Sequence, residues 1–241
     1  MAIALGLEPV TADTTSAASQ QFSSGTQQVA LVELYTSEGC SSCPPADRWI
    51  SRLKDDPRLW NGLVPLSFHV DYWDGIGWAD RFAHPDYSER QRQHVRDGNA
   101  GVVYTPGFFS DGKEWRGFFD RQALNVSGPS VGELVLEVNG RDVSVTFQPL
   151  AETPDPVLVH VALLGMDLET QVGAGENRGR TLQHDFVVLG LKRRKLSNEA
   201  GTFRGELRLP LGVSTQASAI GAWVTGDDEL EPLQAVGGYL R

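Results

Sequence analysis

The chain's two cysteines, Cys40 and Cys43, stand three positions apart in the stretch EGCSSCPPADRW (residues 38–49). Two sulfur atoms at this spacing can take part in thiol–disulfide exchange, bind a soft metal ion or close a tight loop. Exchange requires a thiolate that is ionised near neutral pH and reachable from solvent. The role of the pair therefore depends on the elements that position it.

The segments on either side of the pair have opposite periodicities. VALVELY (residues 29–35) is a short apolar run rich in β-forming residues, which predicts a buried strand. After Cys43, two prolines suit the first turn of a helix, and apolar residues from Ala46 to Leu53 recur at helical spacing. The unpaired backbone amides and the positive end of the helix dipole at a helix start favour an anionic sulfur over a thiol. We therefore expect Cys40 to be the attacking thiolate and Cys43 to be the resolving thiol.

Three further segments complete this region. VPLSFHVDYWD (residues 64–74) alternates as a strand does, and it ends in acidic and aromatic residues. HPDYSERQRQHVRDG (residues 84–98) predicts a polar helix, and VVYTPGFFSDGKEWRGFF (residues 102–119) predicts two strands around a turn. The expected order is strand, helix, strand, helix and hairpin.

This order and three motifs resemble a known family. VELYTSEGCSSCPPADRW, FHVDYWDGIGW and VYTP together look like a secreted bacterial family of unknown function with a core of the thioredoxin superfamily. The resemblance covers residues 29–125 and extends through GENRGRTLQHDFVV (residues 175–188). It implies an α/β thioredoxin-like domain over residues 28–128, and a Cys-x-x-Cys pair between strand and helix fits that assignment.

The resemblance also implies roles for individual residues. Pro106 would follow a cis peptide bond and pack against the dithiol, while the backbone of Thr105, together with Tyr104, would bind an extended substrate. Glu33 would be the buried acid that exchanges protons with Cys43, although the loop to Cys40 is one residue longer here. If Glu33 is buried near that thiol, its pKa should be raised. The alternative for Glu33 is a partly exposed strand carboxylate.

Other polar residues of the same region are weaker candidates. Ser41 and Ser42 offer hydroxyl groups to the thiolate but no charge, so the direction of electron transfer stays open. Asp71 and Trp73 could line a substrate groove, or the loop that carries them could be packed by its own aromatic side chains. We expect His69 to be a strand residue with a hydrogen-bond partner rather than a metal ligand.

The remaining segments indicate a second domain and a loose start. Alternating strands with frequent glycine predict an antiparallel β-sandwich over residues 129–241. VGAGENRGR (residues 172–180) lacks the spacing of a dinucleotide loop and is interpreted as a turn. Residues 1–27, rich in Ser, Thr, Ala and Gln, are expected to be disordered or the remnant of a signal peptide.

Composition limits the partners and the compartment. A net charge of -10 and a pI near 4.9 argue against a nucleic-acid surface. The sequence contains no run of roughly 18 apolar residues, so no membrane span is expected. The N-terminal segment favours a periplasmic or secreted location, and the oligomeric state cannot be read from the sequence.

Three functions fit these observations. The first is a thiol–disulfide oxidoreductase that acts on protein thiols or disulfides and needs no cofactor or metal beyond its own dithiol. The second is a module that binds copper(I) or a related soft metal ion through both thiolates, with or without one histidine, although no His or Met stands beside the pair. The third is a structural or interaction protein whose disulfide closes a loop. A loop this short gains little from cross-linking, which favours the first.

Overall fold

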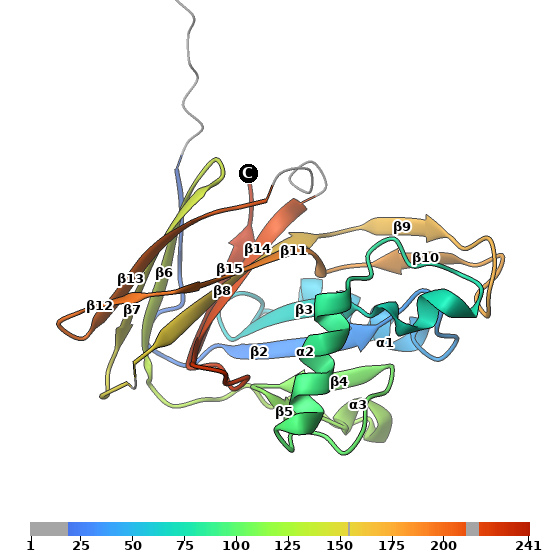
Figure 1. Cartoon of the computed structure of the whole chain (residues 1–241), viewed down its shortest axis with the longest axis horizontal. Coiled ribbons are helices and arrows are strands. Elements are labelled where there is room, and N and C mark those ends of the chain that lie inside the picture. The colour runs from blue at the N-terminus through green and yellow to red at the C-terminus, as the bar shows by residue number, and fades with distance from the viewer. Residues whose placement is uncertain (1–18, 154, 211–216) are drawn as a thin grey trace, which may run out of the picture.

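The computed structural model describes residues 19–153, 155–210 and 217–241, which are mostly β (Figure 1). The strands are β1 (Gln20–Ser23), β2 (Ala30–Thr36), β3 (Leu63–His69), β4 (Gly107–Ser110), β5 (Lys113–Glu114), β6 (Gly132–Asn139), β7 (Asp142–Pro149), β8 (Val157–Gly165), β9 (Leu168–Gln171), β10 (Thr181–His184), β11 (Val187–Lys195), β12 (Ser197–Glu199), β13 (Thr202–Arg208), β14 (Ala217–Gly226) and β15 (Gln234–Tyr239). The helices are α1 (Pro44–Ser51), α2 (Pro85–Arg96) and α3 (Gly117–Asp120), with 3-10 segments η1 (Arg52–Asp55) and η2 (Asp71–Ile76).

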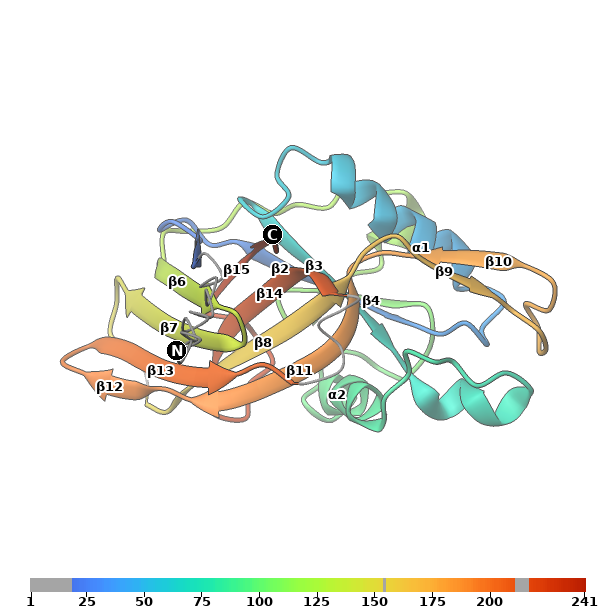
Figure 2. The same cartoon turned by 90° about the horizontal axis from the view of Figure 1, so that it is seen from above.

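One large sheet runs through most of the described chain. Its strand order is β15-β14-β8-β11-β3-β2-β4-β5, with parallel pairing only where β3 meets β2 and β11. Helices α1 and α2 lie on opposite faces of this sheet near β2 and β3 (Figure 2). Strands β2 and β3 are therefore buried along their whole length, which fits the apolar run of β2, whereas the polar residues of the alternating β3, Ser67 and His69, are buried as well.

A second sheet of five strands, ordered β1-β6-β7-β13-β12, packs against the β8 and β14 end of the large sheet. Alternate residues of these strands face each other and form a separate core that includes Leu134, Leu136, Val143, Val145, Val159, Val161, Ile220 and Val224. This arrangement confirms the predicted sandwich-like packing of the β-rich region. Strands β9 and β10 form a third sheet, a separate two-stranded ribbon.

The prediction of an α/β thioredoxin-like N-terminal domain is wrong. Its three α-helices span only 8, 12 and 4 residues, and β2, β3 and β4 are not a sheet of their own. They continue the large sheet, because β11, which lies beyond residue 128, pairs with β3. Local periodicity predicts where strands form but not which distant strand completes the sheet. The prediction therefore failed on the pairing of β3 with β11.

The expected loose start is partly replaced by a strand. Residues 1–18 lie outside the described residues, whereas β1 pairs with β6 in antiparallel register, with Phe22 opposite Leu136. Phe22 also packs against the sandwich core. Backbone pairing and this one aromatic side chain order a segment whose composition predicts disorder.

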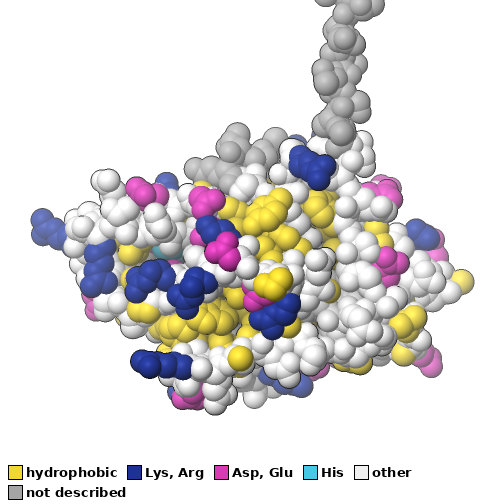
Figure 3. Space-filling model, turned by 180° about the vertical axis from the view of Figure 1, so that it is seen from behind, with side chains coloured by type: hydrophobic (Ala, Val, Ile, Leu, Met, Phe, Trp, Pro, Cys, Tyr) yellow, Lys and Arg dark blue, Asp and Glu magenta, His cyan; other side chains and the backbone are white. Residues whose placement is uncertain are grey.

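Figure 3 shows the face opposite the one seen in Figure 1. Exposed hydrophobic side chains lie near its middle, and Lys and Arg gather toward the end that holds β9 and β10. Among the described residues, no helix is both long and apolar enough to cross a membrane.

Candidate functional site

The two cysteines form a disulfide between the end of β2 and the start of α1. Cys40 and Cys43 are bonded with their Cα atoms 5.4 Å apart, and the N–H of Cys43 donates to the Cys40 carbonyl at 3.2 Å. Cys43 is the N-cap of α1, which begins at Pro44. The sequence therefore placed the pair correctly beside a helix start.

The first turn of α1 does not offer amides to an anionic sulfur. Pro44 and Pro45 carry no N–H, and the amides of Ala46 and Asp47 both donate to the Cys43 carbonyl, at 2.8 and 3.1 Å. The prolines that predicted the helix thus remove the donors that were expected to stabilise a thiolate. Of the contributions that the helix itself could make, its dipole is left for that purpose.

Both sulfur-bearing residues are sealed from solvent. Cys40 and Cys43 are 0% exposed, although Ser41 and Ser42 between them are exposed. The Ser42 hydroxyl oxygen lies 3.3 Å from Cys40 Sγ. The expectation that the Cys40 sulfur is reachable is therefore wrong for this disulfide-bonded state. Exchange at Cys40 would require a neighbouring segment to move.

One side of the disulfide loop lies against Trp73, which joins it to a segment with a cis peptide bond. The Thr105–Pro106 bond is cis, as the family resemblance implied, and it leads into β4. Trp73 of η2 donates from Nε1 to the Thr105 hydroxyl at 2.8 Å. A Cβ atom on Gly39 would lie 3.1 Å from Trp73 Cβ, so this tryptophan contacts the loop directly before Cys40.

A mostly apolar groove of about 550 Å³ begins at the same place. Its lining residues are Ser42, Pro45, Val102, Tyr104, Thr105, Pro106, Arg116, Phe118 and Phe119. Val102 and Phe119 are 63% and 44% exposed, and the Tyr104 hydroxyl donates to Glu114 at 2.7 Å. The structure thus brings together Ser42, Tyr104, Thr105 and Pro106 from the sequence prediction. The groove is open to solvent, mostly apolar and adjacent to Ser42 of the disulfide loop.

Asp71 does not take part in this groove. Its amide donates to the Ser88 hydroxyl at 3.0 Å, and the same hydroxyl donates to its carboxylate. Asp71 therefore joins η2 to α2. Of the two residues proposed for the loop after β3, the structure places only Trp73 against the disulfide loop and Thr105.

Glu33 is buried, but it is not placed to act on Cys43. Its carboxylate accepts hydrogen bonds from Tyr35 and from Arg90 of α2, and His94 lies 3.4 Å away. Burial alone would raise the pKa of Glu33, but Arg90 and His94 outweigh it and hold the pKa well below its usual range. Side chains alternate along β2, and Thr36, three positions after Glu33 and therefore on the other face, contacts α1. Glu33 thus faces α2, while the cysteines open α1 on the other face.

Five titratable side chains form a buried acid–histidine cluster beside the disulfide loop: Glu38, Asp47, His69, Asp80 and His184. His69 Nδ1 lies 2.6 Å from Asp80 Oδ2, so this histidine has the hydrogen-bond partner that was expected. His184 Nε2 lies 3.5 Å from Glu38, and its Nδ1 lies 3.9 Å from Asp47. Burial raises the pKa of Asp47. The cluster links β10, which carries His184, to the segments around the cysteines.

The cluster does not have the geometry of a metal centre. Among the described residues, no three His, Cys, Asp or Glu side chains are arranged to hold a metal ion. Several buried atoms of the cluster, including His69 Nε2 and both ring nitrogens of His184, have no hydrogen-bond partner within the described protein. The copper hypothesis also gains nothing from the pair itself, because both thiols are consumed in the disulfide.

The other side of the disulfide loop is covered by the tip of the β9–β10 ribbon. Asn177 is 0% exposed, and its side-chain amide donates to the carbonyls of Glu38 and Cys40, at 2.9 Å each. The neighbouring Glu176 carboxylate accepts from the Ser41 amide at 3.1 Å. Sequence reasoning interpreted this segment only as a turn. The glycine-rich stretch itself gives no sign of a contact with residues more than 130 positions earlier.

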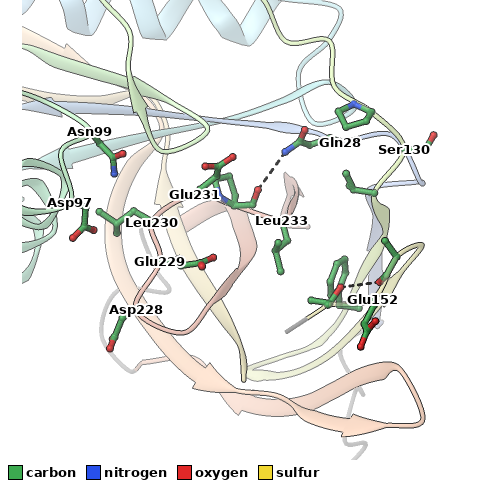
Figure 4. Close-up of a pocket in the computed structure, with 16 residues that line it drawn as sticks. Gln28, Asp97, Asn99, Ser130, Glu152, Asp228, Glu229, Leu230, Glu231 and Leu233 are labelled. Carbon is green, nitrogen blue, oxygen red and sulfur yellow. Dashed lines mark hydrogen bonds between the residues drawn. The ribbon is translucent and has the colours of Figure 1, made fainter. Parts of the chain in front are cut away.

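A cavity of about 700 Å³ lies elsewhere, between the sandwich and the loop after α2 (Figure 4). Carboxylates surround it from several segments, namely Asp97, Glu152, Asp228, Glu229 and Glu231. Gln28 on its wall donates to the Pro232 carbonyl at 3.4 Å. Neither cysteine lines this cavity, so it is separate from the disulfide.

Comparison with known proteins gives a family and a fold. Residues 31–225 match the family described as "Protein of unknown function (DUF1223)". Protein AGR_C_4864 from Agrobacterium tumefaciens, a crystal structure, is 24% identical with a TM-score of 0.59, and the match covers 88% of this chain and 94% of that one. HBP35 of Porphyromonas gingivalis is 16% identical with a TM-score of 0.60, and the match covers 90% and 76%. No curated protein matched the sequence. None of these matches identifies a thioredoxin.

Proposed function

The chain belongs to the DUF1223 family of proteins of unknown function, and we propose that it is a thiol–disulfide oxidoreductase that acts on protein thiols or disulfides through Cys40 and Cys43. The observation that carries this proposal is the place of the disulfide. It lies at the start of α1, and Ser42 inside its loop lines the apolar groove. A partner segment bound in that groove would hold its own sulfur beside the pair. Electrons move only between sulfur atoms, so the dithiol serves as the redox group.

The exchange proceeds in two displacements. A thiolate of the partner attacks Cys40 Sγ, the Cys40–Cys43 bond breaks, and Cys43 leaves as a thiolate that takes up a proton. A second partner thiol, after losing its proton, then attacks the partner sulfur bonded to Cys40. Cys40 is released as a thiolate and the partner keeps a new disulfide. The reverse sequence reduces a partner disulfide, and the uncharged residues Ser41 and Ser42 leave the direction open.

The short loop supports a chemical role over a stabilising one. The two cysteines are three positions apart, and by the chain-entropy relation such a loop stabilises the fold by only about 2 kcal/mol. A disulfide that closes a longer loop would stabilise the fold more. A disulfide between these two positions is therefore a weak stabilising cross-link.

The burial of Cys40 favours a second candidate, a structural protein with a non-catalytic disulfide. A sulfur with 0% exposure and no amide donor from the first turn of α1 resembles an inert, buried pair. In this case the groove would bind a partner without exchange.

Serine substitution of each cysteine separates the two candidates. Cys40→Ser and Cys43→Ser should abolish the acceleration, above background, of both insulin reduction by dithiothreitol and the oxidation of a reduced, unfolded protein. Each should also lower the free energy of unfolding by about 2 kcal/mol. Arg48→Ala, an exposed change on the same helix, is the matched control and should keep full activity. Folded serine variants that match the wild-type rates, or a wild-type protein with no rate above background, would establish the structural candidate instead.

The proposal also includes an oxidising compartment. A resting disulfide persists in the periplasm or outside the cell and is reduced in the cytosol, so we place the protein in an exported fraction. Fractionation of cells that produce the full chain, with thiol alkylation before lysis, should find the protein outside the cytoplasm with its disulfide intact. Recovery in the cytoplasm with two free thiols would contradict this part of the proposal.

A further inference from the structure

The tip of the β9–β10 ribbon, residues 172–180, is held against the disulfide loop by few contacts. Asn177 binds the carbonyls on both sides of Gly39, and Glu176 binds the Ser41 amide. Trp78 packs beneath the tip, where its ring lies 3.2 Å from the position of a Cβ atom on Gly173. These contacts cover the segment that carries Cys40.

The tip itself has little to hold it closed. Within residues 172–180, only Val172 and Asn177 are buried. Glu176 is at the surface, where its interaction with the Ser41 amide is screened by water. A segment with few buried apolar contacts and exposed backbone opens at a lower free-energy cost than the core. The side chain of Asn177 therefore supplies most of the specific contact between the tip and the loop.

The opposite side of the loop is tied down more firmly. Trp73 packs on Gly39 and donates to Thr105, and its η2 segment is joined to α2 through Asp71 and Ser88. Movement on that side would disturb η2, the cis peptide segment and the groove together. Movement of the ribbon tip breaks the contacts of Asn177 and Glu176 with the loop, and it separates Gly173 and Gly175 from the Gly77–Trp78 segment.

We infer that the ribbon tip is a latch over Cys40, and that Asn177 is the positioning residue that keeps it closed. Opening of the tip removes three hydrogen bonds from the loop, two made by Asn177 and one by Glu176, and exposes the Cys40 sulfur to an attacking thiolate. The latch would thereby limit reaction to partners that displace the tip or wait for it to open. The use of the latch in catalysis rests on the proposed function, whereas the control of access to the disulfide does not.

The rate at which dithiothreitol reduces the disulfide measures this opening directly. One thiolate of dithiothreitol attacks Cys40, Cys43 leaves, and the second thiol displaces Cys40 to form cyclic oxidised dithiothreitol. The reaction is stopped by alkylation, and the two new thiols are counted by mass spectrometry. No protein substrate is needed.

Asn177→Ala should raise this reduction rate by roughly twentyfold. A hydrogen bond typically changes an equilibrium by about fivefold, and this variant removes two of them from the closed state. Gln183→Ala is the matched control, because Gln183 is exposed on β10 of the same ribbon and does not contact the disulfide loop. The disulfide of this variant should be reduced at the wild-type rate. A folded Asn177→Ala protein that is reduced at the wild-type rate would overturn the latch.

A second variant opens the tip without touching Asn177. Gly175 has φ of +71°, and a Cβ atom there would lie 3.2 Å from Trp78 Cβ. Gly175→Ala therefore strains the closed tip and should also accelerate reduction. If both variants fail to fold, hydrogen exchange of the wild-type protein decides. Amides of residues 173–179 should exchange well before those of β8 and β11, and equal protection would refute the latch.

The latch and the proposed function can fail separately. If the two tip variants are reduced faster but the wild-type protein oxidises and reduces no protein substrate, the proposed function fails and the latch stands. If Cys40→Ser abolishes exchange with protein substrates but the tip variants are reduced at the wild-type rate, the function stands and the latch fails.

Discussion

Replacing Glu33 by glutamine tests whether this residue serves the fold or the dithiol. Glu33 is 0% exposed, and Arg90, whose side chain is 8% exposed, forms two hydrogen bonds with its carboxylate. Glu33→Gln removes the negative charge but keeps one carbonyl oxygen as an acceptor. The guanidinium of Arg90 is then left buried without its counter-ion.

The expected cost follows from this burial. Removing one partner of a buried ion pair typically costs about 3–5 kcal/mol, because the remaining charge is not compensated. The retained acceptor oxygen and the nearby Tyr35 and His94 place the expectation near the lower end, at about 3 kcal/mol. Glu33→Gln should thus be one of the more destabilising conservative changes in β2.

Urea unfolding followed by tryptophan fluorescence measures this loss. The double variant Glu33→Gln with Arg90→Met, which removes both charges, is the control and should lose less stability than the single variant. Exchange rates at the dithiol should change no more than the loss of folded protein explains. A single variant that loses less than about 1 kcal/mol while its thiol–disulfide exchange slows strongly would refute this reasoning and support Glu33 as a base for Cys43.

Three further outcomes follow from the structure. Arg90 and His94 lower the pKa of Glu33 in spite of burial, so the ionised carboxylate stabilises the fold above the usual pKa of 4.5. The free energy of unfolding should therefore fall as the pH drops below that value. The fall should be less steep in Glu33→Gln, which has no carboxylate at this position. Burial alone would lower the pKa of His69, but the neighbouring Asp80 carboxylate raises it. Asp80→Asn should therefore lower the pKa of His69 measured by NMR, and it should lower the free energy of unfolding in urea by about 2 kcal/mol. An unchanged His69 pKa would contradict the pairing. Phe119→Ser in the groove should raise the KM for an apolar peptide disulfide about tenfold. The KM for glutathione disulfide should rise less, and an equal rise for both substrates would argue against binding in the groove.

The location of the disulfide was predictable from short-range signals. A buried β run, a Cys-x-x-Cys spacing and two prolines before a helical period placed Cys40 and Cys43 at a strand-to-helix turn, where the structure has them. The cis peptide bond before Pro106 was implied by the family resemblance, whereas the groove that Thr105 and Pro106 line was not predicted. The strand, the cysteine spacing and the helix start involve residues close in sequence, and local backbone preferences suffice to predict them.

The role of Glu33 could not be predicted in the same way. Strand β2 is buried on both faces, so alternation could separate Glu33 from Thr36 but could not say which face α1 would cover. In the structure, Glu33 pairs with Arg90 of α2. On the other face of β2, the buried carboxylate is that of Asp47, which belongs to α1 and accepts from Thr36. One residue of offset along a strand decides between the two faces.

The sequence by itself determined the strand and helix that flank the cysteines, the sandwich-like packing of the β-rich region and the proximity of the pair. Only the tertiary structure decided that β11 joins β3 in one large sheet, that His184 approaches Asp47, and that Asn177 lies on the Cys40 carbonyl. The physical reason is the length of chain between these partners. Hydrogen bonds and burial between distant segments depend on how the whole sheet closes, and short-range preferences carry no information about that closure.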